Sequence, residues 1–118
     1  MSTDYDSDVW PLGCSWIYPR LERTSKRLKV MVICAHPDDA DLLTGGLTLK
    51  LTERGHRVKY VAVTNGNLGH YEIDPIKLAG MRNEEARRSA EVLGAEYESL
   101  NIDDGHVYVN REQTEKIV

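Results

Sequence analysis

The sequence has no phenylalanine, only two cysteines and no apolar run long enough to cross a membrane. Cys14 and Cys34 do not make a disulfide framework, and no secretion signal or membrane span is visible. We therefore expect a cytoplasmic protein without a membrane span. In the absence of phenylalanine, the core is predicted to consist of leucine, valine, isoleucine and alanine.

Positive charge is also scarce. The chain has 15 lysine and arginine residues against 19 acidic residues, which gives a formal net charge of −4. No basic stripe with interleaved aromatic residues is present, so nucleic acid is not an expected partner. A length of 118 residues allows one domain at most, with a core of modest size.

The most informative stretch is residues 30–41, VMVICAHPDDAD. Its apolar first half is too short for a typical helix and rich in β-branched residues, which predicts a buried strand. The strand ends abruptly at His36, Pro37, Asp38 and Asp39. Ligands of open parallel sheets bind beyond the carboxyl ends of the strands, so an imidazole and two carboxylates at this point indicate a candidate site.

Strand and helix patterns alternate through the rest of the chain. The spacing of apolar residues predicts a helix over 39–54, and a second strand is expected over 58–63. A second helix over 75–93 and a third strand over 95–102 follow. This order predicts an α/β protein with a Rossmann-like three-layer α/β/α fold, in which right-handed crossovers join parallel strands.

The first predicted helix has a wide apolar stripe and two adjacent glycines. The stripe, which we expect to be buried, contains Leu42, Leu43, Leu47, Leu49 and Leu51. Gly45 and Gly46 each cost about 1 kcal/mol relative to alanine in a helix. Such a cost is understandable if this helix must pack closely against the sheet.

The two ends of the chain differ in character. Residues 1–27 show no regular period between their prolines and glycine, and are predicted to be an N-terminal arm that docks on its own domain or on another subunit. At the other end, Asn110 and Gln113 resemble a capping box, but the helical pattern that follows covers hardly two turns. We expect residues 28–118 to be the N-terminal part of a larger domain, or to need a completing chain or a homo-oligomer.

The residue types at 36–39 suit a metal site. An imidazole nitrogen and a carboxylate oxygen are ligands of zinc, and catalytic zinc usually has three protein ligands and a water molecule. The remaining aspartate could act as a general base, because zinc lowers the pKa of bound water to about 7. By itself the pattern also fits a polar turn in which an aspartate caps the helix.

Several short motifs follow one another in a characteristic order. They are AHPDDAD at 35–41, Gly45-Gly46, TNGN at 64–67, Arg82 with Glu85, Leu93-Gly94 and Asp104-Gly105. Together, over about residues 29–118, they resemble the LmbE-like or PIG-L family of zinc-dependent N-deacetylases.

The resemblance implies roles for the turn after the first strand. His36 and Asp39 are implied to be ligands of Zn²⁺, and Asp38 is implied to be the general base. The implied reaction removes an N-acetyl group from an N-acetylglucosamine-type conjugate by hydrolysis, with zinc polarising the amide carbonyl. An N-acetylated amino-sugar conjugate is therefore the expected small-molecule partner.

The predicted substrate-binding residues are Arg82, Asn65 and Asp41. Arg82 matches a family position that helps to hold the sugar, and Asp41 stands where the family often has glutamate. Plainer interpretations exist for two of them. Arg82 and Glu85 could be a surface ion pair on one helix, and Asn65 with Gly66 could simply form a turn.

A third zinc ligand is missing from these motifs. In the family it is a histidine in a later motif that has no match here, although His70 and His106 lie in loops at the expected edge of the sheet. Cys34 is more typical of a core residue than of a nucleophile, and no glycine-rich dinucleotide fingerprint is present. The rival to an enzyme is a binding or assembly module that lacks a metal site and acts through a partner chain.

Overall fold

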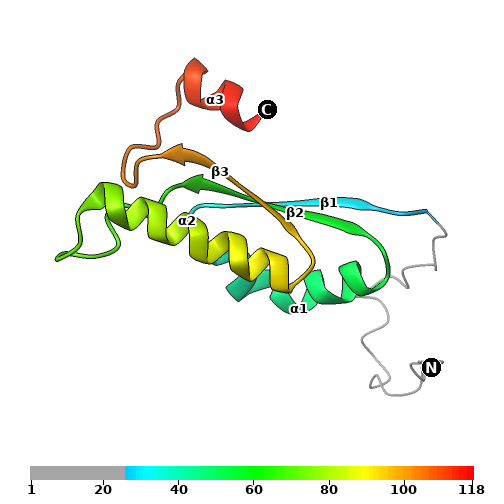
Figure 1. The fold of residues 1–118 in the computed structure, drawn as a ribbon. Helices are drawn as coiled ribbons and strands as arrows, with labels where there is room; N and C mark the ends of the chain where they lie inside the picture. The colour runs from blue at the N-terminus through cyan, green and yellow to red at the C-terminus, as the bar shows by residue number, and fades with distance from the viewer. Residues whose placement is uncertain (1–25) are drawn as a thin grey trace, which may run out of the picture.

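The computed structural model describes residues 26–118, so nearly all of the predicted N-terminal arm lies outside the described residues. The elements are β1 (Lys29–Cys34), α1 (Asp39–Glu53), β2 (Arg57–Thr64), α2 (Pro75–Val92), β3 (Glu96–Ile102) and α3 (Arg111–Ile117). The three strands form one parallel sheet in the order β1-β2-β3 (Figure 1). The predicted α/β class and the parallel sheet are confirmed.

Helices α1 and α2 lie together on one face of the sheet (Figure 1). Both crossovers step across the sheet in the same direction, and right-handed crossovers then place their helices on the same side. Helix α3 lies on the opposite side (Figure 1). Residues 26–118 thus show one full helical layer of the predicted three-layer fold, and α3 is all that they show of the other. None of the helices in this range has the length and apolar character that a bilayer crossing requires.

Tyrosine takes the place of phenylalanine in the core. Tyr60 of β2 is 2% exposed and packs with Ala40, Val58 and Ala90 between the sheet and the two helices. Its hydroxyl group donates a hydrogen bond to Thr48 Oγ1 of α1 at 2.6 Å. Leaving a buried hydroxyl unpaired costs about 1–3 kcal/mol. Thr48, although polar, therefore stabilises the core, because it accepts the hydrogen bond of the buried tyrosine hydroxyl.

The prediction that the leucine stripe of α1 is buried is wrong for Leu42, Leu43, Leu47 and Leu49, which are exposed, and holds only for Leu51, which is partly buried against the core. Leu42 and Leu43 are 77% and 81% exposed, whereas Ala40 and Thr48 are the buried residues of this helix. The large ring of Tyr60 already fills the space beneath α1, so small side chains face the sheet. The buried core still contains the expected residue types, with Leu78 and Ile102 beside alanine and valine, but its largest fully buried side chain is Tyr60.

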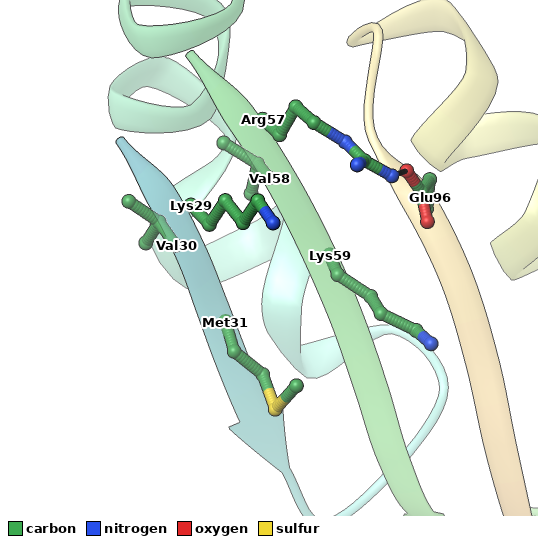
Figure 2. Close-up of a pocket in the computed structure, with 7 residues that line it drawn as sticks. All are labelled: Lys29, Val30, Met31, Arg57, Val58, Lys59 and Glu96. Carbon is green, nitrogen blue, oxygen red and sulfur yellow. Dashed lines mark hydrogen bonds and ion pairs between the residues drawn. The ribbon is translucent and has the colours of Figure 1, made fainter. Parts of the chain in front are cut away.

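The face of the sheet opposite α1 and α2 exposes apolar side chains of β1. Met31 and Ile33 are 58% and 50% exposed. Near the amino ends of the strands this face has a hollow of about 300 Å³, where Arg57 and Glu96 form an ion pair at 2.5 Å (Figure 2). The hydrogen bond from Arg57 lowers the pKa of Glu96. This hollow is at the opposite end of the strands from His36, so it is not part of the candidate site.

Gly46 provides a test of how closely α1 packs. A Cβ atom added there would meet no atom within 4 Å, so the prediction that this glycine permits close packing is wrong. Alanine is favoured over glycine in a helix interior by about 0.5–1 kcal/mol. We expect Gly46→Ala to raise the free energy of unfolding, measured by urea denaturation, by about that amount. A loss of stability would contradict the open surroundings of this position.

Candidate active site

Three loops meet where the parallel strands end. Thr64 at the end of β2 donates two hydrogen bonds to the Ala35 carbonyl beyond β1, from its backbone N–H at 2.9 Å and from Oγ1 at 2.8 Å. The backbone N–H of Asn65 donates to the Ile102 carbonyl of β3 at 3.0 Å. These bonds hold the ends of all three strands, and the loops that follow them, at one edge of the sheet.

The turn after β1 places the imidazole of His36 beside the carboxylate of Asp39. The backbone N–H of His36 donates to Asp39 Oδ2 at 2.9 Å, and His36 Nδ1 lies 3.5 Å from the same oxygen. Beneath the turn, the Cys34 thiol donates to the His36 carbonyl at 3.4 Å. Burial raises the pKa of this thiol, and the charge of Asp39 raises it further. Cys34 therefore stays protonated and supports the turn, which is not the state of a nucleophile.

The adjacent carboxylate, Asp38, makes a different contact. Asp38 is the N-cap residue of α1, but its side chain makes no capping hydrogen bond. Its Oδ2 instead lies 3.7 Å from Arg82 Nη2 of α2, and the side chain is 47% exposed. The interpretation of this aspartate as a helix cap therefore does not hold, and its carboxylate is accessible.

A cavity of about 170 Å³ lies next to Asp38. It is lined by Pro37, Asp38, Asp41, Arg82, Glu85 and Ala86. Arg82 contacts both Asp38 and Glu85, the latter at 3.3 Å, so the predicted ion pair on α2 is also part of the cavity wall. Asp41 Oδ2 accepts a hydrogen bond from Ser89 Oγ at 2.5 Å, which joins α1 to α2 behind the cavity.

Asn65, unlike the other two predicted substrate-binding residues, Arg82 and Asp41, lies outside the cavity. It is 4% exposed. Its Nδ2 donates to Asp103 Oδ1 at 3.0 Å, and its Oδ1 accepts from the backbone N–H of Asn67 at 3.1 Å. The structure thus gives Asn65 the role of joining two loops, and its contact with substrate stays a prediction.

The contact between His36 and Asp104 is not predicted by the sequence. His36 Nε2 lies 3.0 Å from Asp104 Oδ1, although the two residues are 68 positions apart. The backbone N–H of Asp104 donates to Asn67 Oδ1 at 2.9 Å. A signal was present: Asp103 and Asp104 follow the third strand, and residues in that position lie at the same edge of a parallel sheet as the residues after the first strand.

His36 and Asp39 have the spacing of two ligands of one metal ion. Ligand atoms at about 2.0–2.2 Å from a tetrahedral zinc ion are about 3.3–3.6 Å apart, and His36 Nδ1 is 3.5 Å from Asp39 Oδ2. Within residues 26–118, no group of three or more histidine, cysteine, aspartate or glutamate side chains is placed to hold a metal ion. His70 and His106, the two histidines in loops at this edge, therefore complete no such group. His70 Nδ1 accepts from the backbone N–H of Glu72 instead, at 3.1 Å.

Comparison with known proteins identifies the family. Residues 31–118 match the model of the PIG-L family, described as GlcNAc-PI de-N-acetylase. The chain belongs to the PIG-L family. A diacetylchitobiose deacetylase of Thermococcus kodakarensis is 39% identical over 93 residues, a match that covers 76% of this chain and 35% of the relative. This PIG-L family chain thus spans about a third of the length of that relative.

Two solved structures have a similar fold. The N,N′-diacetylchitobiose deacetylase from Pyrococcus horikoshii, in complex with its inhibitor MPG, has a TM-score of 0.71 and 34% identity, covering 75% of this chain and 34% of that one. The 4-carboxy-2-hydroxymuconate hydratase GalB from Pseudomonas putida has a TM-score of 0.66 and 27% identity, covering 72% and 38%. Because enzymes of two reaction classes share this fold, the site itself must decide between them.

Gly66, in the loop after β2, packs closely against the turn that carries His36. Gly66 has a φ of +68°, and a Cβ atom there would lie 3.3 Å from Pro37 Cδ. A side chain in this left-handed region costs about 1–3 kcal/mol. We expect Gly66→Ala to lower the free energy of unfolding by about that amount in urea denaturation.

The matched control for this substitution is Gly80→Ala. Gly80 lies within α2, has no positive φ, and a Cβ atom there would meet nothing within 4 Å. The control variant should be as stable as the wild type or slightly more stable. Equal losses in the two variants would contradict a special requirement for glycine at position 66.

Proposed function

We propose that the protein containing this chain is a metal-dependent hydrolase that removes an N-acetyl group from an N-acetylglucosamine-type conjugate. The observation that carries the proposal is the position of His36, Asp38 and Asp39 at the carboxyl edge of the sheet, beside a cavity. Membership of the PIG-L family and the deacetylase activity named for two similar proteins support it.

His36 and Asp39 are the proposed zinc ligands. Their 3.5 Å separation suits one shared ion, and both side chains are accessible, at 46% and 33% exposed. When bound, the ion would act as a Lewis acid that polarises the amide carbonyl and lowers the pKa of water. The chemistry of the donor set, one imidazole and one carboxylate, is that of zinc enzymes.

Asp38 is the proposed general base. Its carboxylate makes no capping hydrogen bond, borders the cavity and is oriented by the guanidinium of Arg82 at 3.7 Å. In this role it takes a proton from water as the water oxygen bonds to the amide carbon. It returns the proton to the amine nitrogen as the carbon–nitrogen bond breaks, which releases acetate and the free amino sugar.

Arg82 and Asp41 are proposed to bind the sugar, because both line the cavity. A guanidinium group has five N–H donors, so contacts with two carboxylates leave donors for sugar hydroxyl groups. Asn65 would act through the loops that it joins. The cavity of about 170 Å³ is smaller than the roughly 300–1,000 Å³ of most small-molecule sites. It would therefore hold only part of the conjugate.

Two other functions serve as alternatives. Hydration of a carbon–carbon double bond is favoured by the similarity to the hydratase, but the identity of 27% is below the 39% and 34% found for the deacetylases. An assembly module without a metal is favoured by the exposed apolar side chains of β1. The deacetylase is preferred because the matching family model and two more similar proteins are described as deacetylases, and because an assembly module does not explain the pairing of His36 with Asp39.

The proposal predicts zinc-dependent release of acetate. We expect the full-length protein to release acetate from N,N′-diacetylchitobiose, to lose this activity on treatment with a chelator and to regain it with Zn²⁺. Asp38→Asn should reduce kcat by about 10²–10⁴-fold, because a general base contributes about that factor. Acetate release, followed by a coupled assay, measures each effect.

Glu84→Gln is the matched control, because Glu84 is an acid of α2 that pairs with Arg87 and Arg88 and does not line the cavity. It should leave kcat unchanged. Absence of acetate release even with added Zn²⁺ would contradict the proposal. Consumption of an unsaturated hydroxy acid would then support the hydratase, and the absence of both activities and of bound zinc would support the assembly module.

A further inference from the structure

We infer that Asp104 is a positioning residue that fixes the tautomer of His36: its carboxylate accepts the Nε2–H of the imidazole and so leaves Nδ1 unprotonated toward Asp39. The inference rests on the proposed function and deepens it, because it concerns how His36 is prepared to bind a metal ion.

The imidazole of His36 lies between two carboxylates. Nε2 is 3.0 Å from Asp104 Oδ1, whereas Nδ1 is 3.5 Å from Asp39 Oδ2. A neutral imidazole has a single N–H, and only the shorter distance is within the usual range for an N–H···O hydrogen bond. The proton therefore belongs on Nε2.

This tautomer has a consequence at the other nitrogen. The lone pair of Nδ1 then lies close to Asp39 Oδ2, which is also electron-rich, so the two atoms repel each other. A cation between the two atoms removes this repulsion, and the distance suits one that is bound by both. Histidines that bind metals commonly donate their other N–H to a carboxylate, which is the arrangement of Asp104 and His36.

The position of Asp104 is held by contacts that do not involve its side chain. Its backbone N–H donates to Asn67 Oδ1 at 2.9 Å, and the backbone N–H of Asn67 donates to Asn65 Oδ1 at 3.1 Å. Asn65 Nδ2 in turn donates to Asp103 Oδ1 at 3.0 Å. The loop after β2 thus holds the loop after β3 at two adjacent residues. The Asp104 side chain is only 18% exposed, so its carboxylate has little freedom to move away from the imidazole of His36.

The adjacent acid, Asp103, offers a matched comparison. Its carboxylate accepts from Asn65 and has no contact with His36 among the described hydrogen bonds. Removing either carboxylate takes away one negative charge from the same loop. Only the loss of Asp104 removes the acceptor for Nε2–H, so a general electrostatic effect on cation binding can be separated from the effect on the tautomer.

The first test needs no metal. In metal-free full-length protein with ¹⁵N-labelled histidine at about pH 9, well above the ordinary imidazole pKa of about 6.5, the ring nitrogen shifts report the tautomer. We expect the Nε2–H form of His36 in the wild type and in Asp103→Asn, which removes the negative charge but keeps an oxygen that can accept from Asn65. Asp104→Ala should give a mixture of both tautomers. The spectrum of His36→Ala identifies the signals that belong to His36.

The second test measures the affinity for Zn²⁺ alone, by competition with a chromophoric chelator. Asp104→Ala should weaken binding by about 10–100-fold, the usual effect of losing a carboxylate behind a metal-binding histidine. Asp103→Asn, which keeps the acceptor for Asn65, should leave the affinity essentially unchanged. Asp104→Asn retains an oxygen that can accept the Nε2–H, so it should restore part of the affinity and guards against a folding defect in the alanine variant.

The outcomes separate this inference from the proposed function. Wild-type tautomer and wild-type zinc affinity in folded Asp104→Ala would overturn the inference, even if the wild type binds zinc and releases acetate. Conversely, if the wild type does neither but Asp104→Ala still changes the tautomer, the proposed function fails while the positioning role of Asp104 stands.

Discussion

The parallel pairing of β1, β2 and β3 is the arrangement on which the candidate site depends. Parallel strands end at the same edge of a sheet, so the three loops that follow them meet there. The hydrogen bonds from Thr64 to Ala35 and from Asn65 to Ile102 then hold the three ends together. An antiparallel β3 would carry Asp104 to the far end of the sheet, away from His36.

At this edge, the consecutive residues Asp38 and Asp39 make different contacts. Asp39 turns back to His36, while Asp38, one residue earlier, contacts Arg82 of α2 and borders the cavity. The short turn permits this division, because Pro37 restricts the backbone and Gly66 packs against the proline ring. The two carboxylates therefore occupy different surroundings: Asp39 lies beside the imidazole of His36, and Asp38 borders the cavity.

Much of the fold could be predicted because local patterns in this chain agree with the tertiary structure. Asp74 accepts hydrogen bonds from the backbone N–H groups of Ile76 and Lys77, as its place before a proline suggests, and α2 begins there. The inner face of α1 could not be predicted from hydrophobicity. Leu43 is exposed and Thr48 is buried, because the ring of Tyr60 from β2 fills the space beneath α1 and its hydroxyl group donates to Thr48.

The sequence by itself determined the order of strands and helices, the family and the three residues at the end of β1 that the site uses, because these depend on contiguous residues and local periodicity. The tertiary structure alone decided which groups meet across the edge of the sheet. Asp104 reaches His36, Arg82 reaches Asp38, and Asn65 joins two loops instead of lining the cavity. Such contacts depend on strand register and on the space between helices, and no local pattern of residues encodes either.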